Sequence, residues 1–118
     1  MQIIINGKGL ELTGAIEEYI NKKISELDRF HNQIIRAHVT VGMETRHHLK
    51  GKVFLAECRL EVPGNDVFVS KNDATLYQAI DKVRDFAEQE LKKQKTMQRE
   101  KDKKTKTLVR QEKEYSLT

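Results

Sequence analysis

The sequence predicts an α+β domain in which a four-stranded sheet carries two helices packed on one face, followed by a charged C-terminal tail. Apolar residues alternate with polar ones in residues 34–43 and 53–62, and they recur every three or four residues in two other segments. The resulting order is β-α-β-β-β-α, and a right-handed first crossover places both helices on one face of the sheet. We expect residues 1–95 to form the folded domain and residues 96–118 a basic extension, partly helical or disordered.

The first strand and the first helix lie within residues 2–30. Residues 2–8 hold three consecutive isoleucines and end in the turn-prone sequence Asn-Gly-Lys-Gly, which predicts a short buried strand. Thr13 is a good N-cap for the helix that follows, and acids occupy the early turns. The apolar face of that helix is predicted to consist of Ile16, Tyr19, Ile20, Ile24, Leu27 and Phe30.

Residues 34–71 are predicted to form three consecutive antiparallel strands. The first covers residues 34–43, and its expected inner face is Ile35, Ala37, Val39, Val41 and Met43. Residues 44–52 are polar and predict a loop, after which residues 53–62 alternate again with Phe54, Ala56, Cys58, Leu60 and Val62 facing inward. The sequence Pro63-Gly64-Asn65 then predicts a tight turn that returns the chain as a strand over residues 66–71.

A second helix is predicted after this last strand, with Asp73 as its N-cap. Its apolar positions at helical spacing are Leu76, Ala79, Ile80, Val83, Ala87 and Leu91. Because residues 72–118 contain neither proline nor glycine, the helix could continue past Lys95 before it frays.

Positive charge is concentrated in the C-terminal part of the chain. Residues 92–118 carry ten Lys or Arg against four acids, whereas the other 91 residues carry twelve bases against fourteen acids. A near-neutral body with a cationic arm is typical of proteins that bind a polyanion, because the release of counterions from phosphates supplies affinity without a pocket. The distribution favours nucleic acid as the partner, and the alternative is a solvated tail that maintains solubility.

Residues that could carry catalysis or bind a metal are not grouped in the sequence. The histidines are His31, His38 and the adjacent His47 and His48, and neighbours in an extended segment point to opposite sides. Paired acids in the helices have no evident apolar pocket to raise their pKa, and phosphate-loop and serine hydrolase motifs are absent. We therefore expect no enzymatic activity, no cofactor, no metal and no small-molecule substrate. Cys58, the only cysteine, is expected to be a buried and inert thiol.

The cellular compartment follows from two further features. No apolar run is long enough to span a bilayer, and the chain does not open with a signal-peptide pattern. We expect a cytoplasmic protein without a membrane partner.

Basic side chains on the predicted helices and on one strand are candidate contacts with RNA phosphates. Lys22 and Arg29 are seven residues apart and share one helix face, and cations recur along the second helix. The candidate RNA-binding residues are Lys22, Lys23, Arg29, Arg36, Lys82, Arg84, Lys92, Lys93 and Lys95. Acids such as Glu18 and Asp85 lie between them, so a mixed solvated surface is the alternative interpretation.

Four stretches carry a family resemblance. They are residues 1–7, Glu11-Leu12-Thr13 with Tyr19, Ile20 and Lys23 in the first helix, Tyr77-Gln78-Ala79-Ile80-Asp81 in the second, and Leu91-Lys92-Lys93-Gln94-Lys95 at its end. They resemble the short ribosome hibernation-promoting and ribosome-associated inhibitor proteins, also known as sigma-54 modulation or ribosomal subunit interface proteins. The resemblance extends over residues 1–95.

The resemblance implies a non-enzymatic bacterial or plastid factor that occupies the messenger and transfer RNA channel of the small ribosomal subunit. Such proteins contact ribosomal RNA, inhibit translation and stabilise idle ribosomes. The resemblance further implies RNA contacts at Lys23, Lys92, Lys93 and Lys95. Long family members add a C-terminal dimerisation domain, for which the last 23 residues are too few and too polar, so we expect a monomer off the ribosome.

Three positions depart from the family pattern. Phe86 and Gln89 stand where cations are usual, and Thr75 stands where an aspartate is usual. We expect the basic tail to compensate for the two missing cations. Two other functions remain open on the same fold: a protein–protein adaptor, and a general RNA-binding module of the type that binds double-stranded RNA.

Overall fold

The structure, a computed structural model, describes residues 1–46 and 51–95. Its four strands form one mixed sheet in chain order, with β1 (Gln2–Lys8) parallel to β2 (Arg36–Arg46). β3 (Gly51–Glu61) pairs antiparallel with β2 on one side and with β4 (Val67–Asp73) on the other. The crossover between β1 and β2 contains α1 (Gly14–Ser25) and the short 3₁₀ turn η1 (Glu26–Arg29).

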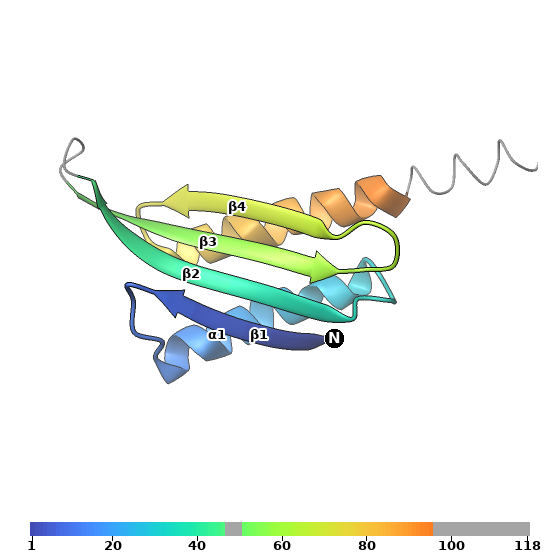
Figure 1. The fold of residues 1–118 in the computed structure, drawn as a ribbon, viewed down its shortest axis with the longest axis horizontal. Helices are drawn as coiled ribbons and strands as arrows, with labels where there is room; N and C mark the ends of the chain where they lie inside the picture. The colour runs from blue at the N-terminus through green and yellow to red at the C-terminus, as the bar shows by residue number, and fades with distance from the viewer. Residues whose placement is uncertain (47–50, 96–118) are drawn as a thin grey trace, which may run out of the picture.

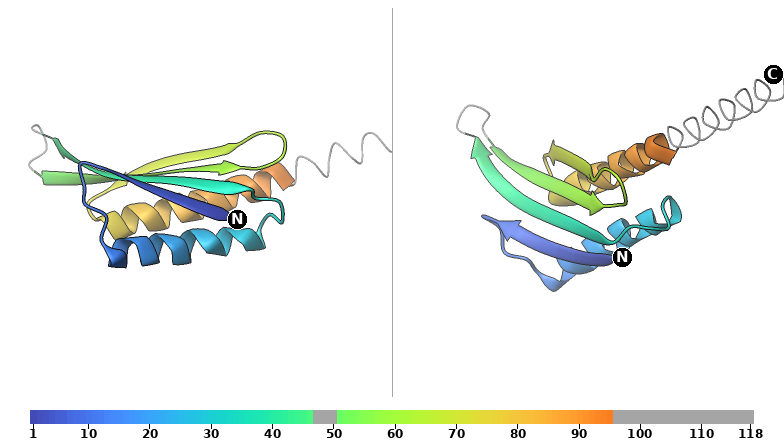
Figure 2. Two further views of the ribbon diagram at one scale, coloured as in Figure 1. Left: turned by 60° about the horizontal axis from the view of Figure 1, so that its bottom comes forward. Right: turned by 45° about the vertical axis from the view of Figure 1, so that its right-hand side comes forward.

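The second helix is described over residues 76–95 and follows β4 (Figure 1). It lies beside α1, and the two helices cover the same face of the sheet while the other face stays open (Figure 2). The predicted α+β class, the order β-α-β-β-β-α and the single helical layer are therefore confirmed. The predicted tail, residues 96–118, lies outside the described residues.

One apolar core fills the space between the sheet and the helices. Ile20 and Ile24 of α1 and Ile80 of the second helix are buried in one cluster with side chains from the inner face of the strands. The predicted inner face of residues 53–62 is confirmed, since four of its residues are buried and Phe54 packs against them. Burial raises the pKa of the Cys58 thiol to about 12, as expected for an inert cysteine.

Two local signals in the sequence are confirmed at the ends of elements. The Thr13 side chain caps α1 by accepting a hydrogen bond of 3.2 Å from the Ile16 amide. In the turn between β3 and β4, Gly64 has a φ of +95°, a conformation that glycine adopts without the steric cost of a Cβ.

Two predictions about β2 are wrong in detail. The side chain of Ile35 is 57% exposed, and Ile34 is buried instead, because both residues precede the strand, where strict alternation does not yet apply. The expected loop over residues 44–52 is shorter than predicted, since Arg46 still pairs with Gly51 across β2 and β3. Pairing with a neighbouring strand outweighs the polar composition of these residues.

The predicted cap of the second helix is also wrong. Asp73 is the last residue of β4 and still pairs with Phe54, so the helix begins later, at residue 76. The cap is Thr75, whose hydroxyl accepts a hydrogen bond of 3.3 Å from the Gln78 amide. Thr75, which departs from the aspartate that the sequence resemblance implies, is therefore itself a capping residue.

Candidate nucleic-acid interface

Eight of the nine candidate RNA-binding residues lie in the helical layer, and Arg36 does not. Arg36 precedes the fully buried Ala37 on β2, so its side chain is on the opposite, open face of the sheet. There its guanidinium lies 3.8 Å from the carboxylate of Glu61, which is its cross-strand neighbour. The structure therefore separates Arg36 from the other candidates by the thickness of the sheet.

Arg84 is held by three carboxylates rather than presented to solvent. Its side chain is only 15% exposed, and its Nε donates to Glu26 of η1 at 3.0 Å. Its Nη1 donates to Asp85 at 3.1 Å and to Glu88 at 2.9 Å. Because these bonds use most of its donors, Arg84 connects the second helix to η1 and is a poor candidate for RNA contact.

Replacing Arg84 by alanine should destabilise the fold. The change leaves the partly buried carboxylates of Glu26 and Glu88 without their guanidinium partner, and we expect the free energy of unfolding to fall by roughly 1.5–3 kcal/mol. Urea denaturation would measure it. In the matched control, Lys93→Ala, an exposed residue of the same helix is changed, and a shift within about 0.5 kcal/mol is expected. If the two variants have equal unfolding free energies, the ion pairs of Arg84 do not stabilise the fold, and Arg84 is again a candidate for RNA binding.

The other seven candidates differ in how far their charge is neutralised. Lys82 pairs with Asp73 at 2.7 Å, and Lys92 lies 3.3 Å from Glu88 and 5.0 Å from the ring of Phe30. Lys23 pairs more loosely, 3.9 Å from Asp81. Among the basic residues whose exposure the structure describes within 1–46 and 51–95, five are exposed and have no ion-pair partner: Lys8 on β1, and the candidates Lys22, Arg29, Lys93 and Lys95.

Tyr19, Lys23, Tyr77 and Asp81 form a contact between the two helices that we call the tyrosine cluster. The Tyr19 hydroxyl donates to Asp81 at 2.5 Å, and the rings of Tyr19 and Tyr77 meet edge to face with centroids 4.7 Å apart. The ammonium of Lys23 lies 5.6 Å from the centroid of the Tyr19 ring. Tyr19 and Asp81 are 62 positions apart in the chain, so their spacing in the sequence gives no sign that they meet.

Titration of the tyrosines should reveal this contact. The hydrogen bond to Asp81, together with burial, raises the pKa of Tyr19 from 10.0 to about 12. Because the folded-state pKa is the higher one, the contact stabilises the protein fully below pH 10.0, and this contribution is lost as the pH rises through about 12. We expect a late tyrosinate absorbance step that Tyr19→Phe removes and Asp81→Ala moves to lower pH. If Tyr19 titrates with an ordinary pKa, the hydrogen bond is absent.

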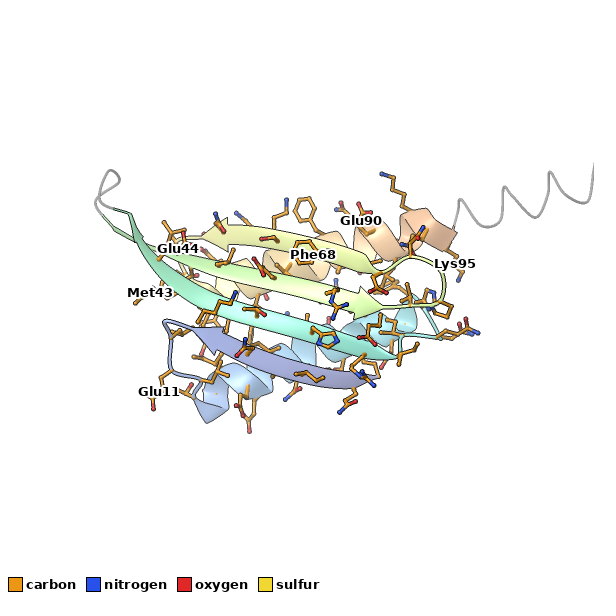
Figure 3. The ribbon with its side chains drawn as sticks, viewed as in Figure 1. Glu11, Met43, Glu44, Phe68, Glu90 and Lys95 are labelled. Carbon is orange, nitrogen blue, oxygen red and sulfur yellow. The ribbon has the colours of Figure 1, made fainter. Side chains whose placement is uncertain are left out.

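On the open face of the sheet, which Figure 3 views from the front, three basic side chains pair with acids beside them. His38 donates to Glu61 at 2.7 Å, and this hydrogen bond, aided by the charges of Arg36 and Arg59, lowers the pKa of the Glu61 carboxyl. Arg59 also pairs with Asp66 at 3.3 Å. Phe68 projects from β4 on this face with 60% of its surface exposed. In the part of the chain that the structure describes, the exposed cations without an ion-pair partner are thus concentrated in the helical layer, with Lys8 as the exception on the open face.

The described residues contain neither a cluster of metal ligands nor a helix that could span a membrane. In the described part of the chain, no three His, Cys, Asp or Glu side chains converge as metal ligands would. His31 accepts a hydrogen bond from the Gln33 amide, while His47 and His48 lie outside the described residues. Within residues 1–46 and 51–95, no helix combines the length and the apolar character that a membrane crossing requires.

Comparisons with known proteins agree with this fold. Residues 3–99 match the family described as Sigma 54 modulation protein / S30EA ribosomal protein. The ribosome hibernation promotion factor of Deinococcus radiodurans is 36% identical over 99 residues, which cover 81% of this chain and 50% of that protein. The ribosome hibernation promoting factor of Azotobacter vinelandii is 34% identical over 98 residues, covering 83% of this chain and 86% of that protein.

A solved structure matches this chain with a sequence identity similar to that of these relatives. The crystal structure of the Thermus thermophilus Protein Y N-terminal domain superposes with a TM-score of 0.68 at 37% identity. The match covers 79% of this chain and 98% of that domain. This chain therefore aligns with nearly the whole Thermus domain, and it spans half of the length of the Deinococcus relative.

Proposed function

This chain belongs to the Sigma 54 modulation protein / S30EA ribosomal protein family, which confirms the resemblance seen in its sequence, and we propose that it is a ribosome hibernation factor. In this proposal it is a non-enzymatic cytoplasmic protein that binds ribosomal RNA in the messenger and transfer RNA channel of the small subunit. Occupancy of the channel inhibits translation and stabilises idle ribosomes. Two relatives that are known as ribosome hibernation factors support the hibernation role.

The distribution of exposed, unpaired cations supports the helical layer as the RNA-binding surface. Four exposed cations without an ion-pair partner among the described residues lie on the helical layer, namely Lys22, Arg29, Lys93 and Lys95. On the described part of the open face, Arg36, His38 and Arg59 pair with acids beside them, and only Lys8 is exposed and unpaired. Unpaired exposed cations can meet phosphates without first breaking a salt bridge. We propose that residues 1–95 bind through the helices, that residues 96–118 add further cationic contacts, and that the free protein is a monomer.

Binding to purified small subunits should be strongly salt-dependent. If about five phosphates are neutralised, the logarithm of the affinity should fall against the logarithm of the salt concentration with a slope on the order of −3 to −5. Co-sedimentation at several salt concentrations would give this slope, and a flat response would contradict binding through phosphates.

Two variants that each remove one positive charge, on opposite faces of the protein, can identify the RNA-binding surface. Lys93→Ala in the helical layer should weaken binding and flatten the slope by about one unit. Lys8→Ala makes the same change on the open face, since Lys8 pairs in register with Gly42 of β2 on the side away from the core, and it should leave the slope unchanged. A larger effect of Lys8→Ala would assign binding to the open face.

The protein–protein adaptor remains a second candidate because of the open face. Ile4 and Phe68 are exposed there, and the cations around them are paired with Glu61 and Asp66. Salt-insensitive binding to a protein partner would favour the adaptor. Competition by transfer RNA on small subunits separates a channel-binding factor from a general RNA-binding module, which would bind elsewhere.

A further inference from the structure

The tyrosine cluster contains an acid on the surface proposed to face RNA. Asp81 is partly exposed, and its carboxylate would repel nearby phosphates if charge alone determined affinity. Its contacts suggest a different effect. It accepts the hydroxyl of Tyr19 at 2.5 Å and lies 3.9 Å from the ammonium of Lys23, so one carboxylate restrains both an aromatic ring and a cation.

Tyr77 is the exposed member of the cluster. Its ring is 44% exposed although it is a large aromatic, and its edge-to-face contact with Tyr19 fixes its position relative to α1. Since Tyr19 is in turn bonded to Asp81, the orientation of Tyr77 depends on two neighbours that belong to different helices. A fixed and exposed tyrosine offers an unpaired nucleobase a surface for stacking at little cost in side-chain entropy.

The Lys23 ammonium and the exposed Tyr77 ring both lie close to the Tyr19 ring. Lys23 lies 5.6 Å from the Tyr19 centroid, and that centroid lies 4.7 Å from the Tyr77 centroid. The Lys23 ammonium is therefore at most about 10 Å from the Tyr77 centroid, a separation that a stacked base and its own or a neighbouring phosphate can span. Neither group is buried, and both belong to the helical layer that carries the unpaired cations.

We propose that the tyrosine cluster is a nucleotide subsite, in which Tyr77 stacks on an unpaired RNA base, Lys23 contacts a phosphate, and Asp81 positions both. This inference rests on the proposed RNA-binding function and adds to it a second kind of contact. Asp81 is a positioning residue, because it acts through Tyr19 and Lys23 rather than through its own charge.

The decisive experiment compares two variants that each remove one acid. Glu18→Ala on the outer face of α1 removes an exposed acid beside Lys22, and affinity for purified small subunits should stay equal or rise, as electrostatics requires. Asp81→Ala removes the same charge and should lower affinity roughly five- to a hundredfold, because the base-stacking contact is lost. Asp81→Asn retains an acceptor for the Tyr19 hydroxyl and should restore most of the affinity.

A second pair of variants tests the stacking ring. Tyr77→Phe retains an aromatic face and should bind within about threefold of the wild type, whereas Tyr77→Leu should lose a similar factor to Asp81→Ala. Thermal denaturation of each variant identifies a temperature at which all of them are folded, and binding is measured there so that a loss of affinity is not a loss of structure. The subsite is wrong if Asp81→Ala binds as tightly as Glu18→Ala, or if Tyr77→Leu binds like the wild type.

The two proposals fail in different ways. A wild-type protein that does not bind small subunits, or binds them without salt dependence, would overturn the proposed function itself. Salt-dependent binding by the wild type, together with unchanged affinity in Asp81→Ala and Tyr77→Leu, would overturn only the nucleotide subsite and would leave a surface that acts through its cations alone.

Discussion

Ile80→Ala is expected to lower the free energy of unfolding by roughly 2–5 kcal/mol, the cost of removing a large aliphatic side chain from a core that cannot fully close around the cavity. Ile80 is 1% exposed and packs in the cluster that joins the second helix to the sheet. A domain of this size has a total stability of about 5–15 kcal/mol, so the loss is a large share of it. Urea denaturation of the variant and the wild type would give the difference.

A control on the same helix isolates burial from helix propensity. Gln89 is exposed, and Gln89→Ala retains a good helix former, so its unfolding free energy should change by less than about 0.5 kcal/mol. Unfolding of Ile80→Ala at the wild-type denaturant concentration would mean that the second helix packs through another face. That outcome would also move the cations of this helix to different positions relative to the sheet.

The helices and strands that could be predicted are those in which the spacing of apolar residues matches the spacing of buried residues. Both helices and the strand over residues 53–62 are amphipathic with a clean period, because one side of each faces the core and the other faces water. Ile35 was misplaced because alternation says which residues share a face but not where a strand begins. Asp73 was misassigned as the cap because several residues before the helix have suitable side chains, and pairing within β4 decides between them.

The candidate site was predicted less well, for a physical reason. A sequence shows where cations are but not which acids the fold brings to them. The bond from Arg84 to Glu88 is visible as a spacing of four residues, yet the bond to Glu26 joins residues 58 positions apart. The tyrosine cluster could not be predicted for the same reason, since it joins residues of two helices that are far apart in the sequence. Periodicity places residues on faces of their own element, whereas a site also requires knowing which elements are neighbours.

The structure locates Phe86 and Gln89, the two positions at which the sequence resemblance implies cations that this chain lacks. Phe86 and Gln89 lie between Lys82 and Lys93 along the second helix, at spacings of four, three and four residues, so all four occupy one side. This side adjoins β4, where the ammonium of Lys71 lies 3.8 Å from the centroid of the Phe86 ring. Both positions are exposed, so cations can replace them without disturbing the core.

Truncation after Lys95 should remove most of the affinity for small subunits while leaving the domain folded. Residues 96–118 carry seven bases and four acids, a net charge of +3, and the last buried core residue in the part of the chain that the structure describes is Leu91. Lost phosphate contacts should also flatten the salt slope. A full-length variant with Lys101→Gln, Lys103→Gln and Lys104→Gln removes the same net charge without shortening the chain, and it should lose a comparable amount of affinity if charge is the cause.

Restoring cations to the second helix should then rescue the truncated protein. Phe86→Lys and Gln89→Arg would extend the exposed stripe that contains Lys93 and add about two phosphate contacts, so the salt slope should steepen again as affinity returns. Co-sedimentation with small subunits measures both quantities. If truncation leaves affinity unchanged, residues 96–118 are a passive tail and do not compensate for the missing cations. A third outcome is that truncation abolishes binding and the double substitution fails to restore it. In that case residues 96–118 contact a site on the ribosome that the second helix cannot reach, and they do not compensate for the cations that are lacking at positions 86 and 89.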